Sequence, residues 1–262
     1  GACVAAADKL DTLSEMFRTE LGQQLDGPVE FHDVALESAR FEGETSEGPL
    51  VDYLTALFSR QRLDLMGTIG GPAARFAHKY RPRLFPSTPM LIAAVDERLL
   101  QTGALTTNDA VVAVTNDLVA MMDNILQVLP ETTNVAMVIG NSPLEKFWLA
   151  ETRRQMQPFT NRLSLTWLND LSFAEVLRRT AALPPRSAIY YFLMSVDAEG
   201  VPYVEERALR ELHAVANAPI FGLHDSQLGR GIVGGPLMAI EDLSRNTAKV
   251  AGRILRGEAA GR

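Results

Sequence analysis

Short runs of apolar and β-branched residues alternate along the chain with longer segments whose apolar residues recur every three or four positions. Val135–Ile139 is apolar throughout, as expected of a strand buried on both faces of a parallel sheet. Alternation of such strands with helices of about 10–15 residues predicts parallel sheets flanked by helices, an α/β fold. The pattern predicts strands at residues 29–34, 64–69, 89–95, 110–114, 135–139, 163–168, 187–194 and 219–222, and helices at 10–21, 49–60, 73–80, 118–129, 144–156, 204–215 and 238–256.

Local signals refine this pattern. Ser142 precedes a proline, which is a good helix start because serine can cap a helix and proline fits its first turn. Ser172 and Glu175 have capping-box spacing, and we expect another helix to begin there. Asp197, shortly before Gly200, is interpreted as a turn residue rather than a ligand contact.

The length of 262 residues suits one large domain or two lobes, and 47% of the residues are apolar, as in globular proteins. With 25 basic and 32 acidic residues, the formal charge of −7 disfavours binding to nucleic acid or anionic lipid. Cys3 is the single cysteine, which excludes an intramolecular disulfide and a thiolate metal cage. The apolar runs are too short to cross a bilayer. Because the chain begins with Gly1, we expect it to be a trimmed piece of a longer protein. The sequence therefore does not tell whether a signal peptide or membrane anchor was removed.

Motifs that would indicate catalysis or a cofactor are weak. Gly229–Gly234 matches the G-x-G-x-x-G pattern, but a polar loop precedes it and one long helix follows it. We therefore interpret it as a tight turn with close backbone packing. His224, Asp225 and Ser226 are adjacent in sequence, so they cannot form a catalytic triad, and the four histidines lack metal-ligand spacing. We expect no catalytic residue, no metal and no cofactor.

Two strand-to-helix turns are candidates for binding an anion such as a carboxylate. Gly70, Gly71 and Pro72 form one turn, and Asn141 and Ser142 belong to the other. A helix N-terminus offers backbone N–H groups and the positive end of the helix dipole, and small residues let a ligand approach the backbone. We expect these turns to share a cleft with further polar residues at strand ends, namely Asn169, Asp170, Ser195, His224 and Asp225.

Several segments carry a resemblance to a known family: residues 64–73, 84–89, 218–222, 228–235 and 254–258. On these segments the chain resembles the type I periplasmic binding proteins, specifically ABC-type substrate-binding proteins and the related extracytoplasmic sensor domains of bacterial histidine kinases. The similarity of pattern extends from about residue 29 to residue 258.

The resemblance implies two α/β lobes, each a parallel sheet flanked by helices, that close on a small solute without catalysis. Lobe one would comprise residues 1–114 and 228–262 and lobe two residues 115–227, with the ligand cleft between them. The chain departs from the family at both ends. Only Ala2–Ala7 is available as the family's first strand, so the contribution of lobe one to the site stays open, and the strand usual after the last helix is missing or truncated.

The expected function is that of an extracytoplasmic solute-binding domain in the periplasm, with or without a membrane anchor in the full-length protein. It would serve either as the substrate-binding component of an ABC transporter, with a membrane permease as its partner, or as the ligand-sensing input of a two-component system, with a histidine kinase module. Arg40–Gly43 and Leu84–Pro86 favour the kinase-linked branch. The expected ligand is a small organic molecule with a carboxylate and an apolar or aromatic part.

Two other function classes stay open. One is a cytoplasmic α/β enzyme that acts on a nucleotide or a sugar phosphate, for which only Asp170 and Asp225 are plausibly placed acids. The other is a dimerising regulatory core without its DNA-binding headpiece. The acidic charge does not exclude such a core, because the core itself does not contact DNA.

Overall fold

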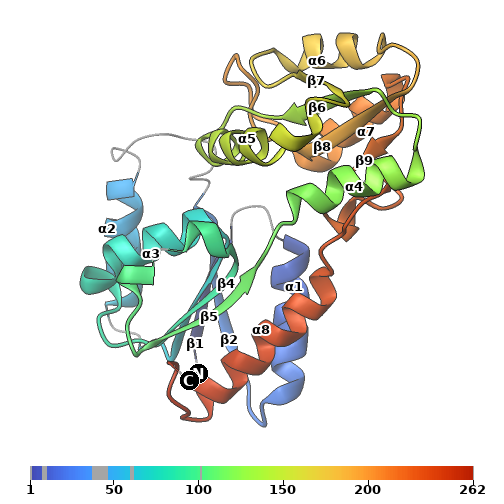
Figure 1. Ribbon diagram of the computed structural model, residues 1–262. Helices are drawn as coiled ribbons and strands as arrows, with labels where there is room; N and C mark the ends of the chain where they lie inside the picture. Colours follow the sequence, from blue (N-terminus) through green and yellow to red (C-terminus); the bar gives the residue numbers. More distant parts are fainter. Residues whose placement is uncertain (1, 8–10, 37–46, 60–61, 101, 262) are drawn as a thin grey trace. The chain divides into compact units, whose positions relative to one another are not determined.

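The computed structural model describes residues 2–7, 11–36, 47–59, 62–100 and 102–261, and it divides the chain into two compact units (Figure 1). Unit one consists of Gly1–Thr115 and Ile240–Arg262, and unit two of Asn116–Ala239. Each unit is built on its own five-stranded sheet, and all neighbouring strands in these sheets are parallel. The predicted α/β class is therefore confirmed.

Unit one has the strand order β2-β1-β3-β4-β5. Its strands are β1 (Ala2–Ala7), β2 (Glu30–Val34), β3 (Leu65–Ile69), β4 (Met90–Asp96) and β5 (Asp109–Val114). Its helices are α1 (Asp11–Gln24), α2 (Glu47–Phe58), α3 (Gly71–Leu84) and α8 (Ile240–Leu255), with the 3₁₀ turns η2 (Glu97–Leu99) and η3 (Thr102–Ala104). Helices α1 and α8 cover one face of the sheet, and α2 and α3 cover the other.

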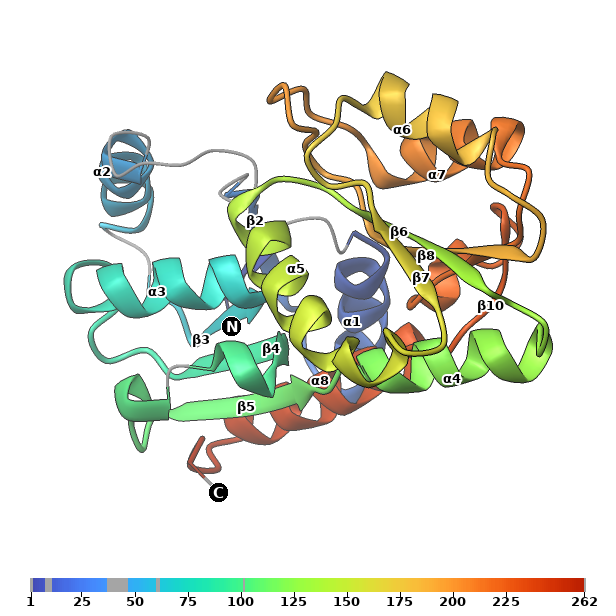
Figure 2. The same ribbon diagram turned by 45° about the horizontal axis from the view of Figure 1, so that its top comes forward.

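The first and last helices of the chain lie side by side in unit one (Figures 1 and 2). Phe17 and Leu21 of α1 belong to the same buried cluster as Ala248 and Ala251 of α8. The small alanines let the helices approach closely, while the large side chains of α1 fill the layer. Burial of each large apolar side chain contributes about 1.5–3 kcal/mol, so this layer joins the two ends of the chain into one unit.

Unit two has the strand order β10-β9-β8-β6-β7. Its strands are β6 (Asn134–Ile139), β7 (Ser164–Trp167), β8 (Ser187–Leu193), β9 (Ile220–Phe221) and β10 (Ile232–Gly234). Its helices are α4 (Leu118–Val128), α5 (Pro143–Gln155), α6 (Phe173–Thr180) and α7 (Glu205–Val215), with the 3₁₀ turns η4 (Gln157–Phe159) and η5 (Asp225–Gln227). Figure 2 shows α6 and α7 on one face of this sheet and α4 and α5 on the other.

Both sheets have the same order when the strands of each are numbered along the chain, namely 2-1-3-4-5. In this order the chain goes from its first strand to a neighbour on one side and from its third strand to a neighbour on the other side. Folds with this order favour ligand binding at the carboxyl ends of these two strands. The divergence lies between β1 and β3 in unit one and between β6 and β8 in unit two. These two points are where the fold favours ligand binding.

Ala2–Ala7, the one segment available as the family's first strand, forms the strand β1, which pairs with both β2 and β3 inside the sheet. The structure differs from the sequence prediction at another strand. The glycine-rich segment was expected to belong to lobe one from residue 228, but β10 pairs with β9, with Ile232 opposite Ile220. The return to unit one therefore falls between Ala239 and Ile240 rather than at residue 228. Among the described residues that follow α8, up to 261, there is no strand.

A buried ion pair fastens the amino edge of the sheet in unit one. Arg81, in the last turn of α3, binds the carboxylate of Asp109 at the start of β5, and its Nη2 also donates to the Thr88 carbonyl at 3.0 Å. The second Asp109 oxygen accepts the Thr106 N–H at 2.7 Å and the Thr106 hydroxyl at 2.9 Å. This network lies at the opposite edge from the strand ends that favour ligands, and it links α3 to the β4–β5 connection.

Replacing Arg81 by methionine should destabilise unit one by about 3–5 kcal/mol, because it leaves the buried Asp109 carboxylate without its cation. Urea unfolding followed by circular dichroism measures this difference. The control is Arg83→Met in the same helical turn, since Arg83 pairs with Asp52 on the surface and such pairs contribute about 0–1 kcal/mol. Equal effects of the two substitutions would contradict a structural role for the buried pair.

Candidate ligand-binding site

The residues predicted to bind a ligand all follow strands, at the carboxyl edges of the two sheets. In unit one, Gly70, Gly71 and Pro72 follow β3. In unit two the remaining candidates follow four strands: Asn141 and Ser142 follow β6, Asn169 and Asp170 follow β7, Ser195 follows β8, and His224 and Asp225 follow β9. Because parallel strands end at a common edge, the structure gathers the candidates of unit two along one edge of its sheet.

The turn after β3 presents an uncapped helix. Gly70 has a φ of +87°, a left-handed conformation that glycine adopts without strain, and its N–H donates to the Ala93 carbonyl at 2.9 Å. Helix α3 begins at Gly71, with Pro72 in its first turn, and no side chain caps its N-terminus. The positive end of this helix dipole therefore meets the carboxyl edge without a neutralising carboxylate in the first turn.

The neighbouring strand adds a cation that the sequence reasoning missed. A bulge between β4 and β5 places Ala94 at a φ of +55°, and the buried Asp96 ends β4 two residues later. The Asp96 carboxylate binds the Arg98 guanidinium through Nε and Nη2, both at 2.7 Å. Bulges near functional edges redirect side chains, and a bidentate carboxylate fixes the orientation of a guanidinium. Arg98 is thus held at the same edge as the α3 N-terminus, where Leu99 lies against Gly71.

In unit two, Glu145 lies at the carboxyl ends of β6 and β8, where the connections that follow these strands lead to opposite sides of the sheet. One oxygen of its fully buried carboxylate accepts the Ser142 N–H at 2.8 Å, and the other accepts the Ser195 N–H. Ser142 in return accepts the Glu145 N–H, which completes a capping box at the start of α5. Asn141 joins the two turns directly, because its N–H donates to the Val196 carbonyl at 2.7 Å.

This arrangement corrects the expected anion site at the second turn. The N-terminus of α5 is occupied by the chain's own Glu145 carboxylate, so a ligand carboxylate placed there would meet a like charge. The signal for Glu145 was present in the sequence, since Ser142 and Glu145 have the same capping-box spacing that was recognised at Ser172 and Glu175.

The candidates after β7 form a short polar chain. Arg153 of α5 donates to the Asn169 side-chain oxygen at 3.2 Å, and Asn169 donates to Asp170 at 2.7 Å. The Arg153 guanidinium also lies over the Trp167 ring, 5.1 Å from its centroid. Asn169 is buried whereas Asp170 is exposed, so Asn169 orients the Asp170 carboxylate toward solvent at the carboxyl edge.

Asp197 is confirmed as a turn residue. Its carboxylate accepts the N–H groups of Glu199 and Val201 within its own loop, at 3.0 and 2.9 Å. It also accepts the Phe173 N–H at the start of α6 and the Tyr203 hydroxyl. Burial raises the pKa of Asp197, but these hydrogen bonds outweigh that effect, and the pKa lies below its usual value. Burial and the bond to Asp197 raise the pKa of Tyr203 to about 12.

The loop after β9 is ordered by Gln227. Its side-chain oxygen accepts the N–H groups of Leu223 and His224, at 3.0 and 3.2 Å, and its amide donates to Glu205 of α7 at 2.7 Å. The His224 ring is half-buried beside this amide, with Nδ1 3.4 Å from the Gln227 nitrogen. Gln227 and Glu205 therefore determine the position of His224, and neither was identified from the sequence.

The glycine-rich segment makes close backbone contacts, as the tight-turn interpretation predicted, and it makes them within unit two. Gly231 has a φ of +124°, and a Cβ there would come within 2.6 Å of the His213 side chain. Gly235 lies against the carbonyl of Gly222, where a Cβ would clash. These glycines allow close backbone approach between β10, its loop and the rest of unit two.

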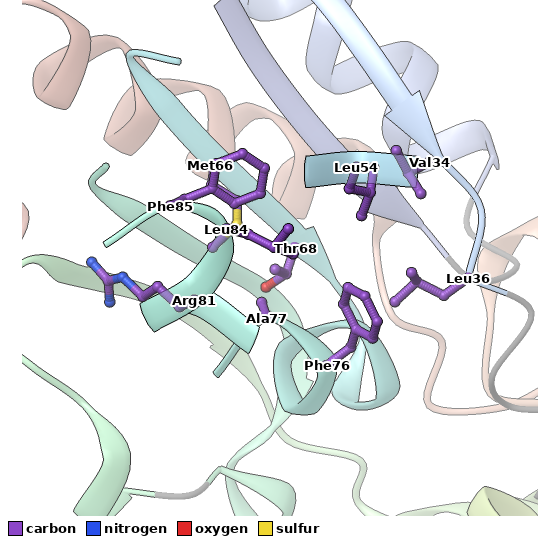
Figure 3. A pocket seen from close by; sticks show the side chains of 10 residues that line it. All are labelled: Val34, Leu36, Leu54, Met66, Thr68, Phe76, Ala77, Arg81, Leu84 and Phe85. Atoms are coloured by element: carbon purple, nitrogen blue, oxygen red, sulfur yellow. The ribbon is translucent and has the colours of Figure 1, made fainter. Parts of the chain in front are cut away.

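A hollow inside unit one is a packing defect rather than a ligand pocket. It lies between the sheet and helices α2 and α3, has a volume of about 20 Å³, and is close to the size of one water molecule (Figure 3). Leu54, Phe76 and Phe85 are among the mostly apolar side chains that line it. In the part of the chain that the structure describes, no helix is long and apolar enough to cross a membrane, and no cluster of three metal-ligating side chains occurs.

The fold is similar to that of several solved structures. The ligand-free, open structure of a substrate-binding protein with adhesive properties from Clostridium difficile aligns with a TM-score of 0.67 at 15% identity, covering 99% of this chain and 86% of that one. The ABC domain of Streptococcus pneumoniae in complex with L-Trp aligns with a TM-score of 0.64 at 15% identity, with the same coverage. A LacI transcriptional regulator from a Rhodococcus species aligns with a TM-score of 0.58 at 14% identity, covering 99% of this chain and 92% of that one.

These alignments establish the fold: the chain has the architecture of the type I periplasmic binding proteins. The resemblance seen in the sequence is confirmed at this level. No family model matches the sequence, and no curated protein sequence matches it.

Replacing Asp197 by asparagine should destabilise the protein at pH 7 by about 1–3 kcal/mol, because buried N–H donors lose a charged acceptor. The lowered pKa also predicts a pH dependence. The stabilisation by Asp197 is complete above about pH 4, the unfolded value, and is lost as the pH falls through the lower folded value. Urea midpoints between pH 7 and pH 2 should therefore fall less steeply in Asp197→Asn than in the wild type. Parallel pH profiles would contradict this assignment.

Proposed function

We propose that this chain is a non-catalytic solute-binding domain that holds one small organic molecule between the carboxyl edges of its two units and closes on it. The observation that carries the proposal is the repeated 2-1-3-4-5 strand order, with a glycine turn after β3 in unit one and polar turns after β6 and β8 in unit two. Closure would follow from contacts that the ligand makes only when both edges engage it, because such differential contacts shift the open–closed equilibrium. The residues proposed to contact the ligand are Gly70, Gly71, Pro72, Asn141, Ser142, Asn169, Asp170, Ser195, His224 and Asp225.

The proposed ligand carries a carboxylate and an apolar or aromatic part. The uncapped α3 N-terminus and the oriented Arg98 guanidinium make the edge of unit one suitable for an anion. The L-Trp in the Streptococcus pneumoniae complex has this combination of groups, and it supports the choice of ligand class for testing.

We further propose an extracytoplasmic setting, either as the binding component of an ABC transporter or as the sensing domain of a histidine kinase. The likeness to substrate-binding proteins supports this setting. Arg40–Gly43, which favoured the kinase-linked branch, lies outside the described residues. The sequence that follows Arg262 in the full gene distinguishes the two roles.

A second candidate is the ligand-binding core of a transcriptional regulator, which the likeness to the LacI regulator favours. That protein shares the fold across nearly the whole chain, and such a core would use the same carboxyl edges to bind its effector. The nucleotide-dependent enzyme is less well supported, because Gly231, the middle glycine of the G-x-G-x-x-G pattern, is packed against the His213 side chain.

Isothermal titration of the purified protein with amino acids, aromatic acids and neutral sugars tests the proposal. We expect saturable binding of at least one carboxylate with one site per chain, accompanied by a higher melting temperature, because a ligand that binds only the folded state stabilises it. If only neutral sugars bind, the anion site on unit one is wrong although solute binding stands. Turnover of a nucleotide would favour the enzyme instead.

Replacing Asn141 or Asp170 by alanine should weaken binding of that solute by about 1–3 kcal/mol, the effect of a lost buried hydrogen bond. The matched control is Asn134→Ala, which removes the same side chain from the opposite, amino end of β6. Asn134 bonds to Thr133 and Pro185 there, so its loss should lower stability and leave the ligand affinity unchanged. Unchanged affinity in both Asn141→Ala and Asp170→Ala would place the site elsewhere.

A further inference from the structure

The Glu145 carboxylate contacts both turns of the divergence point in unit two. Its oxygens accept the N–H of Ser142 after β6 and the N–H of Ser195 after β8. A Cβ at Gly140 would lie 2.5 Å from the Glu145 carboxylate, so the glycine leaves the space that this side chain fills. The two candidate ligand-binding turns are therefore built around Glu145.

The geometry assigns a negative charge to this position. Both Glu145 oxygens act as acceptors of backbone N–H groups, which is the pattern of an ionised carboxylate rather than of a protonated one. The N-terminus of α5 contributes roughly half a positive charge, so the full negative charge of Glu145 exceeds it. The turn that looks like an anion site from its sequence consequently has a net negative charge.

Two further carboxylates and one arginine lie along this edge. Asp225 follows β9 and the exposed Asp170 follows β7, on either side of the Glu145 position in the strand order. Arg153 reaches this edge from α5 through its bond to Asn169. In unit one, by contrast, the turn after β3 has an uncapped helix and Arg98 follows the next strand.

We propose that Glu145 is a specificity-determining residue: it holds the Asn141–Ser142 turn against the Ser195 turn, and its charge excludes an anionic ligand group from both. This inference rests on the proposed solute-binding function and narrows its ligand class. The ligand has one carboxylate at most, and the group that contacts unit two is uncharged or cationic. Monocarboxylates and zwitterions meet this requirement, and dicarboxylates do not.

The wild-type protein tests this directly through acid and amide pairs of equal shape. The probes are terephthalate with 4-carbamoylbenzoate, L-glutamate with L-glutamine, L-aspartate with L-asparagine, and succinate with succinamate. In each pair of which the protein binds a member, titration should show the monoamide bound about tenfold more tightly than the diacid, because like charges near a buried carboxylate repel.

The variant Glu145→Gln should reduce this preference to about threefold or less, because the amide fills the same volume without the charge. The matched control is Glu175→Gln, since Glu175 has the same spacing from a capping serine but pairs on the surface with Arg178 and Arg179. That control should retain the full preference. A merely structural role for Glu145 would lower the melting temperature and the affinity for both members of a pair without changing their ratio.

Several results would overturn the inference and leave solute binding intact. They are a wild type that binds the diacids as tightly as the monoamides, a folded Glu145→Gln with an unchanged ratio, or binding of other solutes but of none of these probes. If Glu145→Gln does not fold, the ratio measured on the wild type still decides. A wild type that binds no solute in the wider titration would instead contradict the proposed function itself.

Discussion

Parallel pairing of every described strand is the constraint from which the rest of the molecule follows. A parallel strand cannot be joined to its neighbour by a tight turn, so each connection must cross over the sheet, usually as a helix. The crossovers cover both faces with apolar layers, which is why strands such as β3 are buried along their whole length. Because of these crossovers all strands of a sheet run in the same direction. Every turn that leads from a strand to a helix therefore lies at the carboxyl edge of that sheet. The candidate ligand-binding residues of this chain lie on those edges because the turns after the strands meet only there.

The apolar pattern of the sequence predicts most of the helices and strands. The elements that it does not predict depend on contacts between distant parts of the chain. Helices and strands of ordinary length were predicted because their apolar residues repeat with the period of each element. The strand β10 has only three residues, two of them apolar and one glycine, so its partner is decided by long-range pairing with β9 and not by its own pattern. Its assignment moved the return to unit one from residue 228 to residue 240. Side-chain roles at the edges were the least predictable, since the burial of Gln227 or Asp96 depends on residues that are distant in the chain.

Glu145 and Glu175 show why identical local signals end differently. Each follows a capping serine by three positions, and each serine accepts the glutamate N–H. Arg178 and Arg179 lie three and four positions beyond Glu175, on the same helical face, and they draw its carboxylate outward. Trp148 and Leu149 occupy the corresponding positions after Glu145, so no cation competes there. The Glu145 side chain turns inward instead, where the Ser195 N–H completes its coordination. The capping-box spacing is visible in the sequence. The inward position of the Glu145 carboxylate is not, because it depends on β8 ending beside β6.

The two units therefore have one topology and opposite chemistry at the same topological position. In unit one the turn after β3 carries glycines and an uncapped helix, and an arginine held by an aspartate follows the next strand, β4. In unit two the divergence point carries a buried glutamate. Strand order alone does not determine this difference, and neither does likeness to solved structures at 14–15% identity. Transporter components and transcriptional regulators can share the fold because the fold determines where the turns lie and not which side chains they carry. Under the proposed solute-binding function, a few side chains in the turns select the ligand, and the difference in charge between the two edges favours a molecule whose two ends differ in charge.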